Sequence, residues 1–272
     1  ANKCWRIVRV GGDGSVKLIL HNDNTTKVAN PCDSANNSTS AAFARYSGET
    51  YKSAFNDDYD DNAYVGFMYG TVGASDYASA HANTNESRIL KNLDAWYNNN
   101  LKTYETVIAD TAWCNDKTNV TDTTYNPWSI GGNATGLGYG TNKTYYGATQ
   151  RLVSTSGGAG GTGPSLKCNG KLSKITSKVG LITADELAYA GYAFNLSNTT
   201  TYLQENATSD YWWSLSPFIF RGDNASVWNV GDSILFGANA NDSRGVRPAI
   251  SLITSTTISG GSGTSEDPYI IE

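Results

Sequence analysis

The side chains best suited to acid–base or nucleophilic chemistry are sparse in this chain. It contains two histidines, His21 and His81, and neither lies in a zinc-ligand or catalytic spacing. Nucleophilic catalysis needs a base positioned beside a serine or cysteine, and no local pattern marks such a pair. Both histidines have polar neighbours, which favours exposed positions. The chain is therefore not predicted to be an enzyme.

The four cysteines are widely spaced and form no CxxC pair. An even number of cysteines in a chain rich in Asn and Thr indicates two disulfides. Of the three connectivities, we predict the sequential pairs Cys4–Cys32 and Cys114–Cys168, which would close two surface loops. Four buried thiols in a cytosolic protein are the alternative.

One acidic cluster, Asp57-Asp58-Tyr59-Asp60-Asp61-Asn62, could offer oxygen ligands to calcium. Its spacing is not that of an EF-hand, and a solvated loop is the favoured interpretation. A structural calcium ion stays an alternative; no other metal or cofactor is predicted. The glycine-rich segment 136–140 lacks the lysine and the strand–helix context of a phosphate-binding loop.

Composition favours an extracellular, loop-rich protein. Only 17% of the 272 residues are charged, whereas the chain holds 17 Tyr, 7 Trp and 28 Gly, which suit large buried areas and irregular turns. The net charge of −5 argues against a nucleic-acid partner. No run of 18 apolar residues predicts a transmembrane segment. Because the chain starts almost directly in a predicted strand with no signal peptide, we expect a processed or truncated product, from which an N-terminal anchor could have been removed.

The elements that would position functional side chains are short. Residues 5–20 alternate around a Gly/Asp turn and predict a hairpin, and the Asn-rich segment 21–44 predicts a long loop. Apolar residues spaced by three and four predict a helix over 85–101, capped by Thr84 or Asn85. A second helix is predicted to begin at a Thr183–Glu186 capping box and to end at Gly191.

Residues 118–172 show little helical or strand pattern and are predicted to be an inserted loop region. The glycine run 157–161 within it predicts flexibility. From residue 211 onwards short strand-like pieces alternate with Gly, Asn and Asp, and 269–271 predicts a last strand. Trp212, Trp213 and Trp228 follow the pattern of a central strand and are predicted to lie in the core. Arg247 is predicted to hydrogen-bond to loop carbonyls.

The C-terminal segment 218–244 combines apolar side chains with adaptable polar ones. This is the composition of protein-binding surfaces, in which apolar anchors are surrounded by polar groups. In the alternative interpretation the apolar residues belong to the core and the Asn and Asp residues form ordinary turns. The predicted ligand-binding residues are Phe218, Ile219, Phe220, Arg221, Asp223, Asn224, Ser226, Asn229, Ser233, Leu235, Phe236, Asn239, Asn241, Asp242, Ser243 and Arg244.

Two segments carry a resemblance to a known family. Tyr-Trp-Trp-Ser-Leu-Ser-Pro at 211–217 and Gly-Val-Arg-Pro-Ala-Ile-Ser-Leu at 245–252 resemble the two fixed borders of the variable region in C-type-lectin-fold proteins targeted by diversity-generating retroelements. The stretches at 4–9, 61–70, 93–97, 113–116 and 181–186 are similar to a gut-bacterial surface and pilin-like family. Between the borders, residues 214–247 contain no Lys, Glu, Gln or Met, which is consistent with codon changes of the kind that such retroelements make.

The resemblance implies one α+β domain over 1–272 with a C-type-lectin-like fold: two main helices, short mixed or antiparallel strands and long loops. It implies that 211–252 is a variable ligand-binding subregion. The expected function is that of an adhesin-like module on a bacterial cell surface or pilus, binding a macromolecular ligand, preferably a protein. A structural minor pilin and a carbohydrate-binding lectin are the alternatives. No Glu-Pro-Asn-type triplet of a calcium-dependent lectin is present, and no cysteine follows Cys168, as formylglycine-generating relatives of the fold would require.

Overall fold

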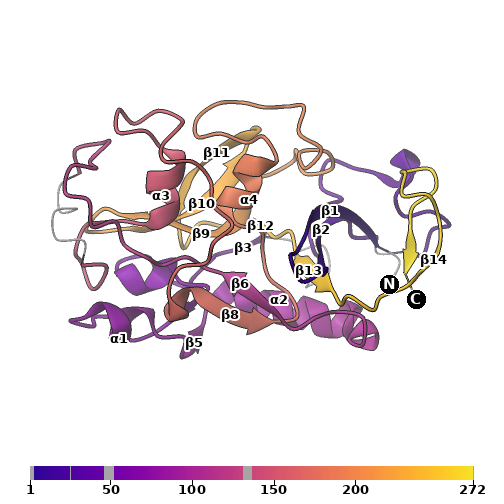
Figure 1. The fold of residues 1–272 in the computed structure, drawn as a ribbon, viewed down its shortest axis with the longest axis horizontal. Helices are drawn as coiled ribbons and strands as arrows, with labels where there is room; N and C mark the ends of the chain where they lie inside the picture. The colour runs from indigo at the N-terminus through magenta and orange to yellow at the C-terminus, as the bar shows by residue number, and fades with distance from the viewer. Residues whose placement is uncertain (1–2, 25, 46–51, 131–136, 272) are drawn as a thin grey trace.

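Two β-sheets form the framework of the fold, towards opposite ends of the molecule (Figure 1). The computed structural model describes residues 3–24, 26–45, 52–130 and 137–271. Helices and several small sheets together confirm the predicted α+β class. None of the helices in these ranges is both long and apolar enough to cross a membrane.

The smaller sheet joins the beginning of the chain to its C-terminal part. The predicted hairpin is confirmed as β1 (Cys4–Val10) and β2 (Val16–Asn22), and Gly14 takes a positive φ of 84° in its turn. The third strand, β13 (Ala249–Leu252), pairs antiparallel with β2. The side chains of β2 from Lys17 to Asn22 are buried, so this hairpin forms one wall of the core.

The larger sheet contains most of the C-terminal segment. Its strands are ordered β11-β10-β9-β12-β3, and β7 pairs with β9. Their bounds are β3 (Lys52–Ser53), β7 (Thr144–Tyr145), β9 (Trp212–Phe220), β10 (Ala225–Gly231), β11 (Ile234–Asn239) and β12 (Arg244–Gly245). The predicted strands from residue 211 onwards are therefore confirmed, although β9 continues far beyond Trp213.

Both faces of β9 are covered. The helices α3 (Gly147–Leu152) and α4 (Ala184–Tyr189) and the 3-10 helix η2 (Asn62–Val65) contact it, and all nine of its residues are buried. Trp212, Trp213 and Trp228 have no exposed surface, as predicted. Because both faces are covered, β9 buries its aromatic and aliphatic residues on either face, and Ser214 and Ser216 are buried with them.

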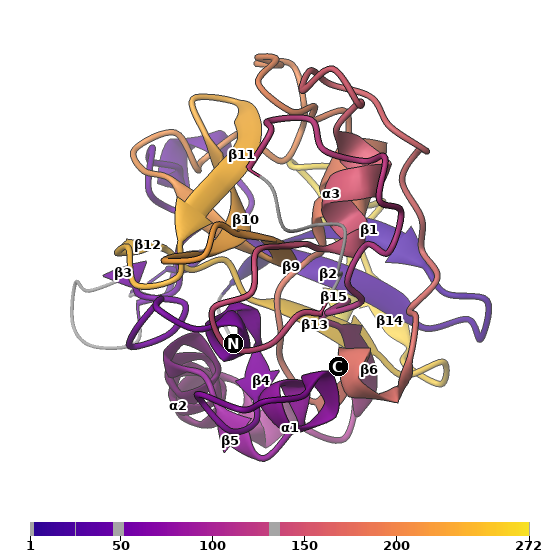
Figure 2. The same cartoon turned by 90° about the vertical axis from the view of Figure 1, so that its left-hand side faces the viewer.

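Helix α2 (Arg88–Asn100) packs Ile89, Leu90, Leu93, Trp96 and Tyr97 into the core. Its N-cap is Ser87, whose hydroxyl accepts from the Leu90 amide, and the predicted caps Thr84 and Asn85 are wrong. Asn85–Glu86 instead forms strand β5, which pairs with β4 (Met68–Tyr69). Figure 2 shows β4, β5, α2 and the short α1 (Tyr77–His81) together below the larger sheet.

The predicted capping box at Thr183 is confirmed. Thr183 Oγ1 accepts from the Glu186 amide at 3.0 Å, and Glu186 Oε2 accepts from the Thr183 amide at 2.9 Å. Helix α4 ends with Ala190 as its C-cap, and Gly191 follows with a positive φ of 98°. The box orients the Glu186 carboxylate, which also binds Lys17 and Arg9 of the smaller sheet.

The segment 118–172 is more ordered than its sequence predicts, because β7 and α3 lie within it and pack on β9 and α4. The glycine run predicted to be flexible closes the C-terminal end of α3. The Gly160 amide donates to the Leu152 carbonyl and the Gly163 amide to the Arg151 carbonyl. Gly160, Gly161 and Gly163 all have φ above 90°, a region that side chains other than hydrogen disfavour.

Both predicted disulfides, Cys4–Cys32 and Cys114–Cys168, are formed. The second starts from the last residue of β6 (Thr111–Cys114), which pairs with β8 (Lys174–Ser177), and closes a loop that contains β7 and α3. The predicted last strand is β15 (Ile270–Ile271), which pairs with β14 (Ile258–Gly260). This terminal hairpin lies at the same end of the molecule as β1 and β2 (Figure 1).

Candidate functional site

The structure divides the predicted ligand-binding residues into buried and accessible ones. The prediction that Phe218, Ile219 and Phe220 are exposed binding residues is wrong, because β9 continues to Phe220 and both of its faces are covered. In the folded chain a partner has no access to Phe218, Ile219 and Phe220, and the same holds for the polar residues Ser226, Asn229 and Ser233, all of which are buried. Leu235 of β11 is buried as well, but its side chain lines a hollow.

The accessible residues occur at two ends of the larger sheet. Arg221, Asp223 and Asn224 form the turn between β9 and β10. Asn239 and Asn241 flank Ala240, whose amide donates to the Ala225 carbonyl at 2.9 Å, so they lie close to the same turn. Asp242, Ser243 and Arg244 follow Asn241 directly and lead to the other end of β9, where Gly245 pairs with Trp212. The accessible residues therefore lie at the β9–β10 turn, along 239–244 and at this second end.

At that second end, Tyr211 gathers residues from three segments. Its ring lies edge-on to the ring of Phe236, with centroids 5.4 Å apart, and the Arg244 guanidinium lies 5.1 Å from its centroid. Its hydroxyl donates to Asp232 at 2.9 Å. Arg244 in turn donates to Asp242 at 2.8 Å. We call Tyr211, Asp232, Phe236, Asp242, Ser243 and Arg244 the Tyr211 surface.

A hollow of about 180 Å³ opens beside this surface. Tyr211, Asp232 and Arg244 line it, together with Thr208, Ser209 and Asp210. Lys52 forms an ion pair with Asp210, and the hydrogen bond from Tyr211 to Asp232 raises the pKa of the Tyr211 hydroxyl. Tyr211 therefore keeps its proton and acts as a donor at neutral pH. The hollow is mainly polar, with an aromatic wall.

Tyr211 was missed because the predicted ligand-binding residues began at Phe218, and Asp232 was missed although it lies within 218–244. A signal for Tyr211 exists in Gly231: a Cβ there would lie 2.3 Å from Tyr211 Cδ1, so this strand-end glycine makes room for the ring. The role of Gly231 can be recognised only when the end of β10 is known to lie beside Tyr211. The two residues are twenty positions apart, so the sequence alone does not reveal their contact.

Arg247 holds the loops behind the site, as predicted. Its guanidinium donates to the carbonyls of Leu203 and Leu20 and lies 4.6 Å from the ring centroid of Trp212. The residue is 1% exposed, and burial lowers its pKa to about 10. Arg247 is therefore a structural cation.

The two histidines are buried, which corrects the prediction that they are exposed. His21 Nε2 lies 3.2 Å from Arg6 Nη2, and His81 Nε2 lies 2.7 Å from the Gly138 carbonyl. Burial lowers the pKa of each to about 3, with further contributions from Arg6 at His21 and Lys117 at His81. Neither histidine hydrogen-bonds to a serine or cysteine within the described ranges.

The acidic cluster organises a turn. Asp61 caps η2 by accepting from the Ala63 amide at 2.8 Å, and its other oxygen accepts from the Gly73 amide at 3.0 Å. Asp57 forms an ion pair with Arg88. In the part of the chain that the structure describes, no three His, Cys, Asp or Glu side chains are grouped to hold a metal ion.

Comparisons of the chain with protein-family models, with curated proteins and with solved structures find no match. The candidate site is therefore defined by its geometry alone. The ring of Tyr211 lies between the Arg244 guanidinium and the ring of Phe236, with the carboxylates of Asp232 and Asp242 beside them, and this partly exposed group borders a polar hollow.

Proposed function

We propose that the chain is a non-catalytic recognition module that binds a protein ligand outside the cell through the Tyr211 surface. The resemblance of 211–217 and 245–252 to C-type-lectin-fold variable proteins supports such a fold, a place on a bacterial surface or pilus and diversification of the binding region. Two disulfides are typical of proteins that mature in oxidising compartments.

The observation that carries the proposal is the packing around Tyr211. Tyr211, Phe236 and Arg244 are half-exposed, and contacts with one another and with Asp232 and Asp242 hold them in place. Aromatic and arginine side chains dominate the binding energy of protein interfaces. A side chain that is already ordered loses less conformational entropy on binding.

A screen of bacterial and host surface proteins by biolayer interferometry tests this proposal. The double variant Phe236→Ala/Arg244→Ala should weaken a hit at least ten-fold, because truncating interface anchors usually costs more than about 1.4 kcal/mol. The control is Tyr104→Ala, a 39% exposed tyrosine outside the site, which should leave affinity unchanged. Equal affinity of the double variant, with its melting temperature retained, would contradict the assignment.

An assembly subunit is the second candidate function, favoured by the terminal hairpin. Ile258, Tyr269 and Ile270 are 57%, 47% and 55% exposed there. Contiguous exposed apolar side chains commonly mark interaction sites. If this hairpin joins neighbouring subunits, analytical ultracentrifugation should show concentration-dependent association that Ile258→Ser/Ile270→Ser abolishes; a monomer at all concentrations argues against it.

A further inference from the structure

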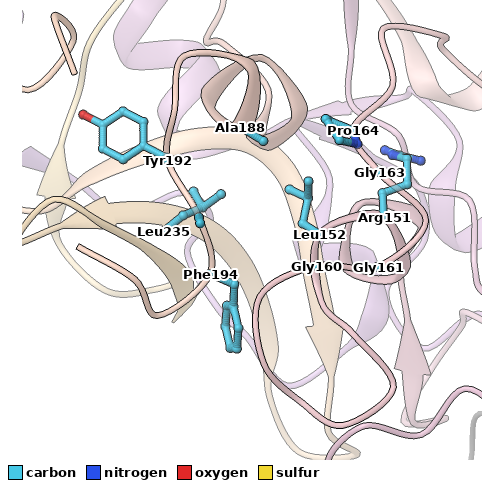
Figure 3. A pocket seen from close by; sticks show the side chains of 11 residues that line it. Arg151, Leu152, Gly160, Gly161, Gly163, Pro164, Ala188, Tyr192, Phe194 and Leu235 are labelled. Carbon is cyan, nitrogen blue, oxygen red and sulfur yellow. The ribbon is translucent and has the colours of Figure 1, made fainter. Parts of the chain in front are cut away.

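A second hollow, of about 190 Å³, is lined by none of the residues of the Tyr211 surface. Figure 3 shows it from close by. It is open to solvent and is bordered by α3, α4, the segment 192–194, the start of β11 and the glycine-rich segment after α3. Leu152 and Leu235 point towards each other across it, whereas the Arg151 guanidinium points away from Leu235 (Figure 3). Its lining residues are Arg151, Leu152, Gly160, Gly161, Gly163, Pro164, Ala188, Tyr192, Ala193, Phe194 and Leu235.

The walls of this hollow are held in place without any occupant. Backbone hydrogen bonds tie Gly160 and Gly163 to the last turn of α3. Across the opening, the Tyr189 hydroxyl donates to the Pro164 carbonyl at 2.9 Å and so links α4 to the rim. On β11, Leu235 exchanges backbone hydrogen bonds with 193–195. A preformed cavity binds more tightly than one that must be ordered.

Apolar surface continues outside the hollow. Leu166, Tyr189 and Leu196 are 54%, 60% and 58% exposed. Each adjoins a lining residue: Leu166 follows Pro164 by two positions, Tyr189 bonds to Pro164, and Leu196 forms a β-bridge with Ala193. An apolar hollow with an apolar rim is a surface that a partner would cover.

Charge and size restrict the occupant. Arg151 is the only charged lining residue, and Asp116 and Asp185 pair with it at 2.9 and 2.6 Å, so an ionic ligand would find no free counter-charge. Sites for drug-sized molecules measure roughly 300–1,000 Å³, and a cavity of about 150 Å³ accepts benzene. A hollow of about 190 Å³ therefore matches one uncharged ring.

We propose that this hollow, here named the Leu235 socket, receives a single uncharged aromatic side chain from a protein partner. It is an anchor site separate from the Tyr211 surface. Successive side chains of a strand point to opposite faces, so Leu235 faces the socket while Phe236 faces Tyr211. One partner segment that crosses 193–195, the segment paired with β11 at Leu235, would meet both sites.

The test is an NMR titration of the intact chain with N-acetyl-L-phenylalaninamide. We expect saturable shifts at the amides of Ala188, Ala193 and Leu235, with a dissociation constant in the millimolar range. Phenylacetate and phenethylammonium should bind at least five-fold more weakly, because the socket offers no counter-charge, and N-acetyl-L-alaninamide should not saturate. This experiment uses the unaltered protein. The proposal is overturned if the charged probes bind as tightly as N-acetyl-L-phenylalaninamide, or if N-acetyl-L-phenylalaninamide does not saturate.

A variant that fills the socket provides a second test. Ala188→Leu puts a larger side chain into the hollow and should raise the dissociation constant of N-acetyl-L-phenylalaninamide at least ten-fold. Ala190→Leu, two positions further and outside the lining, is the matched control and should bind like the parent. Unchanged binding by Ala188→Leu refutes the site. Phe236→Ala/Arg244→Ala should leave the probe's affinity intact, which separates failure of the socket from failure of the Tyr211 surface.

Discussion

Arg247 connects regions that are distant in sequence. Its guanidinium donates to carbonyls at Leu20 and Leu203 and stacks on Trp212. This buried cation is stabilised by two carbonyl oxygens and an aromatic face, whereas its Nε has no hydrogen-bond partner among the described residues.

Arg247→Ala should lower the free energy of unfolding by about 3 kcal/mol or more, since it leaves two carbonyls and a cavity behind. Arg244→Ala, which removes a half-exposed pair with Asp242, should cost less than about 1 kcal/mol. Urea denaturation of both variants checks this pair. Equal destabilisation would mean that the carbonyl contacts of Arg247 contribute little.

The role of a single residue could be predicted from the sequence where its chemistry allows few structural roles. It could not be predicted where burial by distant elements decides the role. Four widely spaced cysteines and an arginine before a proline have few structural uses, and their roles were predicted. Phe218 and Phe220 could have been anchors or core, and only the coverage of β9 by distant elements decides. His21 and His81 were misplaced for the same reason.

Among the elements, α4 is the one that local sequence determines best. Its capping box lies entirely within 183–186, so its start was predictable. Helix α2 begins later than predicted, because residues 85 and 86 pair with β4, a contact that local pattern does not contain. The order within 118–172 was invisible for a similar reason: β7 is two residues long and exists through its pairing with β9.

Thr183→Ala should destabilise the protein by about 1 kcal/mol, because the Glu186 amide loses its acceptor. Thr183→Ser keeps the hydroxyl and should recover most of this loss. Thermal unfolding followed by circular dichroism measures both variants. Identical melting temperatures for the alanine and serine variants would show that packing, and not the cap, sets the stability here.

At the scale of the whole molecule, the buried neutral histidines make stability depend on pH. Their folded pKa values of about 3 lie below the ordinary value of 6.5, so the unfolded chain binds more protons below pH 6.5. Stability should therefore be complete above pH 6.5 and fall as pH drops towards 3. Each histidine contributes a loss of about 2 kcal/mol at pH 5.

Urea unfolding at pH 7.5 and pH 5.0 measures this loss. His81→Gln removes one titrating group while retaining a donor for the Gly138 carbonyl. Between pH 7.5 and pH 5.0, the free energy of unfolding should fall by about 2 kcal/mol less in this variant than in the parent, whatever the variant's stability at pH 7.5. An unchanged pH dependence would show that carboxylates alone cause the acid sensitivity.

The pairing of β2 with β13 has a consequence for how the chain reaches this structure. Arg247, beside β13, and Leu20, in β2, are 227 residues apart in sequence yet hydrogen-bonded. Contacts so distant slow folding, because a long loop must close first. While the chain is synthesised, the hairpin of β1 and β2 stays unpaired on one side until Leu252 has emerged. We expect the nascent protein to need protection of that strand edge until its last segments arrive.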